Sequence, residues 1–278
     1  MKRVSLLVAA LVVGAISTAV AFGAAGTKQG NTMPVIDVAM DGNSISVTGN
    51  LVSGAVDIHS TTTGAPGSGA PLFIRLNPGV TADQVVAVLQ TKKANDPNVV
   101  ADYGSIVFDP GPGIEDVQTI LQPADYVAFD SAKNNPANWP YTTFTIADNK
   151  SPATLPAAQE WQKSVEFKFR GPSTLHTGQI IRATNAGYVV HMIIGIQVKD
   201  QASGRKVVKA LRAGDDRQVG KFALPGFFSL FGPLSHGAVA QFTLNAKPGW
   251  YVEACFMDTQ DGREHTRLGM ERVVHIVK

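Results

Sequence analysis

After an apolar run at its start, the chain is made of short stretches in which apolar and polar residues alternate. Alternation puts every second side chain on the same face of the backbone, which is typical of a half-buried β-strand. Turn pairs such as Pro78-Gly79 and Pro248-Gly249 separate the stretches. Only residues 81–91 and 204–212 have the pattern of short helices. The clearest strands are predicted at residues 45–48, 165–169, 240–244 and 250–255.

The apolar run at the start has the pattern of a secretory signal peptide. Lys2 and Arg3 precede apolar residues 4–20, and small residues follow, with Ala19-Val20-Ala21 as a cleavage signal. At this length the run is slightly short for a membrane span. We therefore expect residues 1–24 to be removed, and the mature protein to be exported, periplasmic or extracellular, with no span of the membrane.

The same order of segments occurs twice along the chain. Gly54, in the stretch 50–58, aligns with Gly178 in 173–181, and three further segments align at offsets of about 120 residues. A near-constant offset predicts two homologous domains. We place them at residues 34–147 and 156–278, with an extended, Pro- and Ala-rich linker at 148–155. Many strands and little helix in domains of this size predict an all-β chain of two tandem β-sandwiches.

Charge and cysteine content narrow the function. Without Lys2 and Arg3 the chain has equal numbers of basic and acidic residues, so nothing gives it a net attraction for nucleic acid. Cys255 is the single cysteine, so no disulfide forms within the chain. A lone thiol in an oxidising compartment is buried and inert, paired between chains, or bound to a metal.

Residues with metal-binding side chains cluster near the end of the chain. Cys255 ends a predicted strand, His265 follows after nine residues, and Met270 after four more. Far upstream, a loop that contains Asn185 precedes His191, at the start of another predicted strand. Two imidazoles, a thiolate and a weak thioether suit both Cu(I) and Cu(II). A lone His, Cys or Met would be core filler, but the four together indicate a copper site.

This pattern resembles the cupredoxin superfamily, in which an Asn-containing loop precedes the first His ligand and one loop carries Cys, His and Met. The long Cys-to-His spacing is similar to that of the copper nitrite reductase cupredoxin domain. The resemblance covers about 120 residues of the second domain and implies Greek-key sandwiches with a type 1-like site for one copper ion. The metal ligands implied are His191, Cys255, His265 and Met270. We expect His265 to lie nearer the surface than His191 and Cys255.

The first domain lacks this ligand set. The repeat alignment puts Pro71 at the position of His191 and Asp130 at that of Cys255, so we expect a metal-free cupredoxin-like sandwich. The other four histidines, His59, His176, His236 and His275, lack converging ligands and are interpreted as structural.

One-electron transfer to an unknown redox partner is the function that these residues favour. Two alternatives stay open: a copper chaperone or store, which needs the same ligands, and a metal-free binding or structural module of the cell envelope. The apolar segment 227–231 would suit docking in such a module, although burial against the sandwich explains it as well. An enzyme is not expected, because His-x-His pairs and hydrolase or nucleotide-binding motifs are absent from the sequence.

Overall fold

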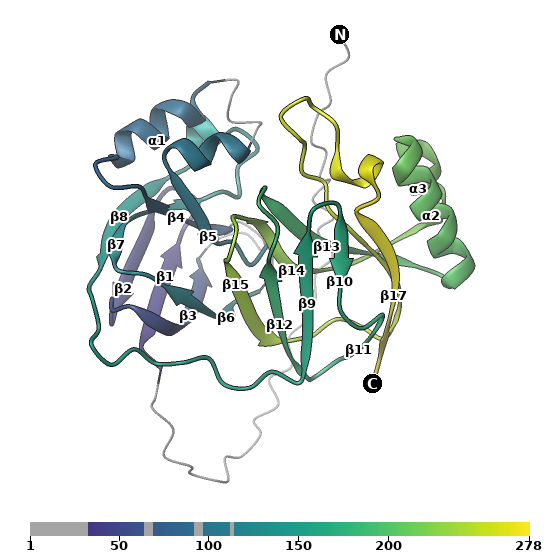
Figure 1. Cartoon of the computed structure of the whole chain (residues 1–278), viewed down its shortest axis with the longest axis horizontal. Coiled ribbons are helices and arrows are strands. Elements are labelled where there is room, and N and C mark those ends of the chain that lie inside the picture. Colours follow the sequence, from purple (N-terminus) through teal and green to yellow (C-terminus); the bar gives the residue numbers. More distant parts are fainter. Residues whose placement is uncertain (1–32, 64–68, 92–96, 112–113) are drawn as a thin grey trace.

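The computed structural model describes residues 33–63, 69–91, 97–111 and 114–278. The predicted signal peptide, residues 1–24, lies outside them. Two β-sandwiches lie side by side, the first drawn in purple to teal and the second in green to yellow (Figure 1). Within the described part, no helix is long and apolar enough to cross a membrane. The prediction of an all-β chain with two sandwiches is confirmed.

Within the described residues, eight strands and one α-helix build the first sandwich. One layer contains β1 (Val35–Met40), β2 (Ile45–Gly49), β3 (Gly54–Thr62) and β6 (Asp116–Leu121). The other contains β4 (Pro71–Leu76), β5 (Gly104–Phe108), β7 (Ala124–Asp130) and β8 (Tyr141–Ile146). Helix α1 (Ala82–Leu89) and the 3-10 turns η2 (Pro97–Asp102) and η3 (Pro136–Asn138) lie in the connections.

The second sandwich repeats this plan with one more strand and one more α-helix among the described residues. One layer contains β9 (Glu160–Val165), β10 (Lys168–Arg170), β12 (Ile180–Asn185) and β15 (Val239–Thr243). The other contains β11 (Thr174–His176), β13 (His191–Val198), β14 (Ala223–Leu234), β16 (Gly249–Ala254) and β17 (Glu271–Val277). Helices α2 (Gln201–Ala213) and α3 (Asp216–Phe222) and the turn η4 (His265–Leu268) complete it.

Strand pairing shows the repeat in three dimensions. β1 pairs antiparallel with β2 and parallel with β3, and β9 pairs in the same way with β10 and β12. Gly54 pairs with Leu121, and the Gly178 amide donates to the Leu244 carbonyl oxygen at 2.8 Å. Both glycines have positive φ, +114° and +84°, which a side chain would disfavour. Gly54 and Gly178 therefore occupy equivalent places, as the alignment predicts.

The two sandwiches share a sheet and a core. β6 pairs with β15 through Gln118 and Gln241, whose side chains are joined by a 2.9 Å hydrogen bond, so one eight-stranded sheet runs through both halves. A second contact joins β5 and β14, where the Ser235 amide donates to the Ile106 carbonyl oxygen at 2.8 Å. One apolar cluster includes side chains of both sandwiches. The halves are therefore packed as one body.

Helices α2 and α3 lie on the outer side of the second sandwich (Figure 1). Val207 and Leu211 of α2 pack on Val252 and Ala254 of β16. The sequence predicts a helix from residue 204, but α2 begins at Gln201, because the Asp200 side chain accepts from the Ser203 amide and caps the first turn.

One strand prediction needs correction, and the burial expected of one apolar segment is confirmed for most of it. Residues 165–169 alternate like a strand, yet Glu166 and Phe167 form the turn between β9 and β10, with Phe167 at φ +53°. The apolar segment 227–231 belongs to β14, and from Phe228 to Phe231 its side chains are buried. Phe227 remains 55% exposed. Burial, rather than an apolar docking loop, therefore accounts for most of this segment.

Candidate metal centre

Three strands of one sheet position the predicted ligands. His191 begins β13, Cys255 follows β16, and Met270 directly precedes β17. β16 lies between β13 and β17 and pairs antiparallel with both. His265 begins η4, in the connection between β16 and β17. Side chains that are far apart in the sequence therefore meet at one end of this sheet.

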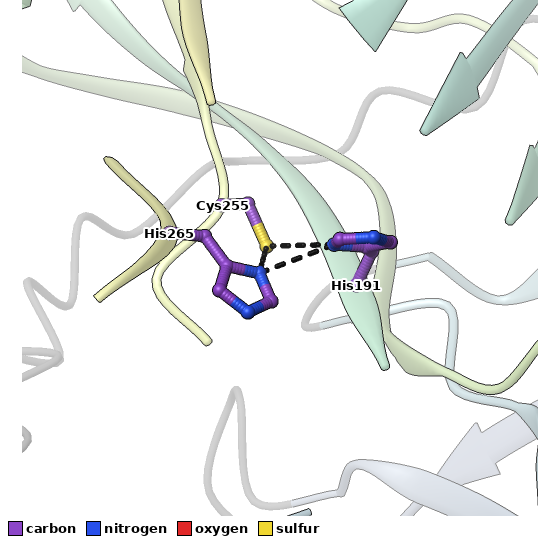
Figure 2. A group of neighbouring side chains, drawn as sticks. All are labelled: His191, Cys255 and His265. Atoms are coloured by element: carbon purple, nitrogen blue, oxygen red, sulfur yellow. Dashed lines mark hydrogen bonds between the residues drawn. The ribbon is translucent and has the colours of Figure 1, made fainter. Parts of the chain in front are cut away.

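The two imidazoles and the thiol converge on one point (Figure 2). The Cys255 Sγ lies 3.3 Å from the His265 Nδ1 and 3.8 Å from the His191 Nδ1. The two Nδ1 atoms are 3.1 Å apart. All three side chains are fully buried. This is the one group of three His, Cys, Asp or Glu side chains with metal-binding geometry in the described residues.

Met270 is fully buried in the same core. Its amide donates to the His265 carbonyl oxygen at 3.1 Å, and its carbonyl oxygen accepts from the Cys255 amide at 3.2 Å. The backbone of Met270 is thereby joined to both neighbouring ligands. The four buried residues form a group consistent with a type 1 copper site.

Burial keeps the ligands uncharged. Desolvation, together with the neighbouring His265, lowers the pKa of His191 to about 3, and desolvation lowers the pKa of His265 to about 4. Desolvation raises the pKa of the Cys255 thiol to about 12, against the amide N–H groups of Met192 and Met257. At neutral pH both imidazoles are therefore in the form that binds a metal, whereas the thiol must lose its proton.

The protonation of the two imidazole rings favours a cation at the point where the three side chains converge. Both Nδ1 atoms face the thiol, and both Nε2 atoms are buried without a hydrogen-bond partner among the described residues. A neutral imidazole protonated at Nε2 presents its Nδ1 lone pair inward. The thiol has only one hydrogen to donate, so it cannot satisfy both Nδ1 lone pairs. A metal ion at this point would accept both lone pairs and the sulfur. The residues present therefore fit a copper ion.

Asn185 holds the loop that leads to His191. Its Oδ1 accepts from the Gly187 amide at 2.9 Å and from the Ser164 hydroxyl at 3.1 Å. Its Nδ2 donates to the carbonyl oxygens of Val189 and Leu234, at 2.9 and 2.7 Å. These four bonds saturate the buried amide and hold the loop in place before His191 begins its strand.

The β9–β10 turn covers the histidines. The Phe167 ring meets the His265 ring edge to face, with centroids 5.0 Å apart, and the His191 ring at 6.5 Å. Beside it, a Glu166 carboxylate oxygen accepts from the Tyr188 amide. Beneath this cover His265 has no solvent-exposed surface, and neither have His191 and Cys255, so exposure does not distinguish the three side chains. The sequence does not mark Glu166 and Phe167, since the strand-like alternation there hides the turn.

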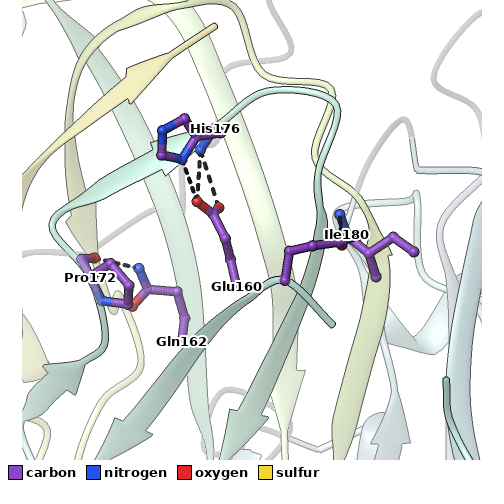
Figure 3. A network of polar contacts seen from close by, with 6 residues as sticks. Glu160, Gln162, Pro172, His176 and Ile180 are labelled. Atoms are coloured by element: carbon purple, nitrogen blue, oxygen red, sulfur yellow. Dashed lines mark hydrogen bonds and ion pairs between the residues drawn. The ribbon is translucent and has the colours of Figure 1, made fainter. Parts of the chain in front are cut away.

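The other histidines have their own partners. His59 lies 2.8 Å from Asp116, and His236 lies 2.9 Å from the Gly187 carbonyl oxygen. The His275 ring stacks on Trp250 with centroids 4.1 Å apart. Figure 3 shows the His176 ring and amide bonded to the buried carboxylate of Glu160, which ties β11 to β9. None of the four belongs to the group at Cys255.

Among its described residues, the first sandwich has no matching group of imidazole and thiol donors. Pro71 and Asp130, which the repeat alignment puts at the positions of His191 and Cys255, pair with each other across β4 and β7. The Asp130 carboxylate accepts from the amides of Ala70 and Ala132 at 3.0 and 3.2 Å.

Comparisons with solved structures find distant matches. No protein-family model matches the chain, and no curated protein matches it. An auracyanin from Roseiflexus castenholzii is 18% identical, over 42% of this chain and 95% of that one, with a TM-score of 0.26. A purple cupredoxin from Nitrosopumilus maritimus is 14% identical, over 43% of this chain and 100% of that one, with a TM-score of 0.25. A copper-containing nitrite reductase from Thermus scotoductus is 11% identical, over 88% of this chain and 67% of that one, with a TM-score of 0.26.

Proposed function

We propose that the second sandwich binds one copper ion through His191, Cys255 and His265, with Met270 as a weaker fourth ligand. We propose further that the protein uses this ion to carry single electrons. The observation that carries the proposal is the convergence of three buried donor atoms within 4.8 Å of one another. Copper supplies the one-electron change between Cu(I) and Cu(II).

The donor set favours copper over other common ions. A trigonal pair of imidazoles with one thiolate, completed by a long thioether contact, is the arrangement of copper electron-transfer sites. Ca²⁺ and Mg²⁺ require oxygen ligands, and none of the four side chains supplies one. Zinc accepts imidazole and thiolate, but its structural sites take a fourth Cys or His rather than Met.

The surroundings of the ligands suit electron transfer. The saturated amide of Asn185 fixes the loop before His191, and the Phe167 ring keeps water away from both imidazoles. Ligands that are held in place change little when the charge of the ion changes, so little reorganisation opposes the transfer. In this proposal the surrounding protein supplies rigidity and a dry environment.

A copper store or chaperone is the second candidate for the same ligands. Delivery requires that a partner reaches the ion, whereas both imidazoles here are fully buried beneath the β9–β10 turn. Burial therefore supports the carrier. The rates of electron exchange and of copper transfer distinguish the two candidates. A carrier exchanges electrons faster than it loses copper, whereas a delivery protein transfers Cu(I) to an acceptor within minutes.

The proposal also treats the protein as a non-enzymatic carrier that works outside the cytoplasm with a redox partner protein. Support for the first part is that the described residues offer one metal-binding group. Support for the second is the signal-like pattern of residues 1–24. Assays of oxidase and nitrite reductase activity on the copper-loaded protein test the first part. N-terminal sequencing of protein recovered from the exported fraction tests the second.

A copper titration of the purified full chain tests the site. We expect one equivalent to bind and the oxidised protein to develop an intense visible band from thiolate-to-copper charge transfer. Cys255→Ser should remove the band, because a hydroxyl is too hard and too weakly acidic to replace the thiolate. His59→Ala, in a histidine outside the group, is the matched control and should keep it. If no stoichiometric copper binds, the metal-free binding module takes the place of this proposal.

A further inference from the structure

One side chain of the first sandwich contacts both loops that carry histidine ligands in the second. The Asn98 Oδ1 accepts from the Val190 amide at 3.0 Å, and Val190 directly precedes His191. The Asn98 Nδ2 donates to the Asp258 carbonyl oxygen at 3.3 Å. Asp258 lies in the loop between Cys255 and His265. A single amide therefore joins the two ligand loops, which approach it from different strands.

Asn98 is fixed within the first sandwich. It lies in η2, which directly precedes β5, and the Tyr103 amide there donates to the Val100 carbonyl oxygen at 2.9 Å. Asn77, at the end of β4, holds the same segment, since its Nδ2 donates to the Ala101 carbonyl oxygen at 3.1 Å. Val100 and Tyr103 pack against the apolar core. The bonds from Asn98 therefore tie the ligand loops to a rigid part of the neighbouring domain.

The loop after Cys255 has internal bonds of its own. The Thr259 amide donates to the Arg263 carbonyl oxygen at 2.8 Å, and the His265 amide donates to the Met257 carbonyl oxygen at 2.8 Å. These bonds give the loop its local shape. They do not set its distance from the loop before His191, which the Asn98 amide spans.

We propose that Asn98 is a positioning residue for the metal centre, and that the first sandwich acts as a brace for the ligand loops of the second. The inference rests on the proposed function, because it assigns Asn98 to the copper site. Ligands that are held in place before the metal arrives bind it more tightly and release it more slowly. A domain without donors at the equivalent position thereby contributes to the site of its neighbour.

Asn98→Ala in the full chain tests the brace, with Asn77→Ala as the matched control. Both variants remove an asparagine side chain that bonds at η2, but only Asn98→Ala breaks the two bonds to the ligand loops. In the metal-free protein we expect hydrogen exchange of the Val190 amide to be roughly tenfold faster in Asn98→Ala. In the copper-loaded protein we expect copper loss to a chelator to be roughly tenfold faster. Asn77→Ala leaves both bonds to the ligand loops in place, so it should have a clearly smaller effect than Asn98→Ala in both measurements.

Asn98→Asp distinguishes the bond to Val190 from the bond to Asp258, and it replaces Asn98→Ala as the test if that variant does not fold. It keeps an acceptor for the Val190 amide and loses the donor to the Asp258 carbonyl oxygen. We expect Val190 to stay protected while the amides of residues 257–264 exchange faster. Equal exchange and equal copper loss in wild type and both Asn98 variants would overturn the brace, as would equal effects in Asn77→Ala. A wild type without copper or the visible band would instead overturn the proposed function.

Discussion

The Nδ1 atoms of His191 and His265 lie 3.1 Å apart, although 74 residues separate the two histidines in the chain. Two neutral imidazoles attract each other in this arrangement only if one ring carries its proton on Nδ1 and donates it to the other, or if a cation lies between them. The buried thiol of Cys255 faces both atoms. The approach of these two rings is therefore the structural reason to expect a metal at this point.

Copper affinity should rise with pH. The Cys255 pKa, raised to about 12, keeps the thiol protonated, and the pKa values of about 3 and 4 keep His191 and His265 neutral. Between about pH 5 and 9 one proton must therefore leave for each copper bound, so affinity should increase about tenfold per pH unit. Below about pH 4 the slope should steepen, because the imidazoles also bind protons. Competition titrations with a chelator measure the slope, and a slope of zero would contradict a protonated thiol.

Met270→Leu should retain copper and shift its reduction potential upward. Leu nearly conserves the volume of this fully buried side chain, so we expect a loss of stability below about 1.5 kcal/mol. The thioether is a weak donor to Cu(II), and its loss favours Cu(I). Voltammetry gives the potential, and metal analysis gives the copper content. Met257→Leu, at another buried methionine of the same core, is the control. An unchanged potential in Met270→Leu would remove Met270 from the ligand set.

Much of the site can be predicted from sequence, because its chemistry depends on residue types at the ends of recognisable strands. His191 and Cys255 stand next to alternating segments, and His265 and Met270 follow at short spacings. The repeat likewise predicts two sandwiches, since Gly54 and Gly178 mark turns that need positive φ in both halves. Local patterns of this kind survive folding unchanged.

Features that depend on contacts between distant segments cannot be predicted from local sequence patterns. The turn at Glu166 and Phe167 has no Gly, Pro or Asn to mark it, and its left-handed residue packs against the His265 ring. Beneath this turn the His265 side chain has no solvent-exposed surface. The contact of Asn98 with Val190 depends on how the two sandwiches pack, which no local pattern records.

Glu166→Gln should raise the reduction potential of the bound copper. The Glu166 carboxylate is the negative charge that favours protonation of both His191 and His265, so it also favours the higher charge of Cu(II). Its removal should raise the potential by on the order of 60 mV, equivalent to a tenfold change in the ratio of Cu(I) to Cu(II) binding. Glu115→Gln, the same change at an exposed site of the first sandwich, is the control and should leave the potential unchanged.

Gly187→Ala should disturb the His191 ring directly. A Cβ at Gly187 would lie 2.6 Å from the His191 Nε2, 2.8 Å from its Cδ2 and 2.8 Å from a Glu166 carboxylate oxygen. Because the ring of the proposed ligand would have to move, we expect this variant to lose copper to a chelator faster than the wild type. Glu166→Gln keeps the shape of the side chain and leaves the ring in place, so it should not share this effect. Equal rates of copper loss in Gly187→Ala and wild type would contradict the role of His191 as a ligand.

Asp109 should make the stability of the protein fall as pH rises from about 4 to 7. This side chain is buried at the contact between β5 and β14, where its oxygens pack against Gly232. Desolvation raises its pKa to about 7, against the hydrogen bond from the Gly111 amide. The folded state therefore holds a proton that the unfolded state releases near its ordinary pKa of 3.8.

The contribution of Asp109 is fully present below about pH 4 and is lost as pH passes through about 7. Asp109→Asn removes the ionisation while it keeps the shape and the acceptor for the Gly111 amide. We expect this variant to be more stable than the wild type above pH 7, by a few kcal/mol at most, and to lose the difference at pH 4. Urea unfolding at both pH values measures it. An equal stability difference between variant and wild type at both pH values would show that Asp109 does not titrate with folding. Asp102→Asn, which removes a carboxylate on η2 in the same domain, is the control for the change in net charge.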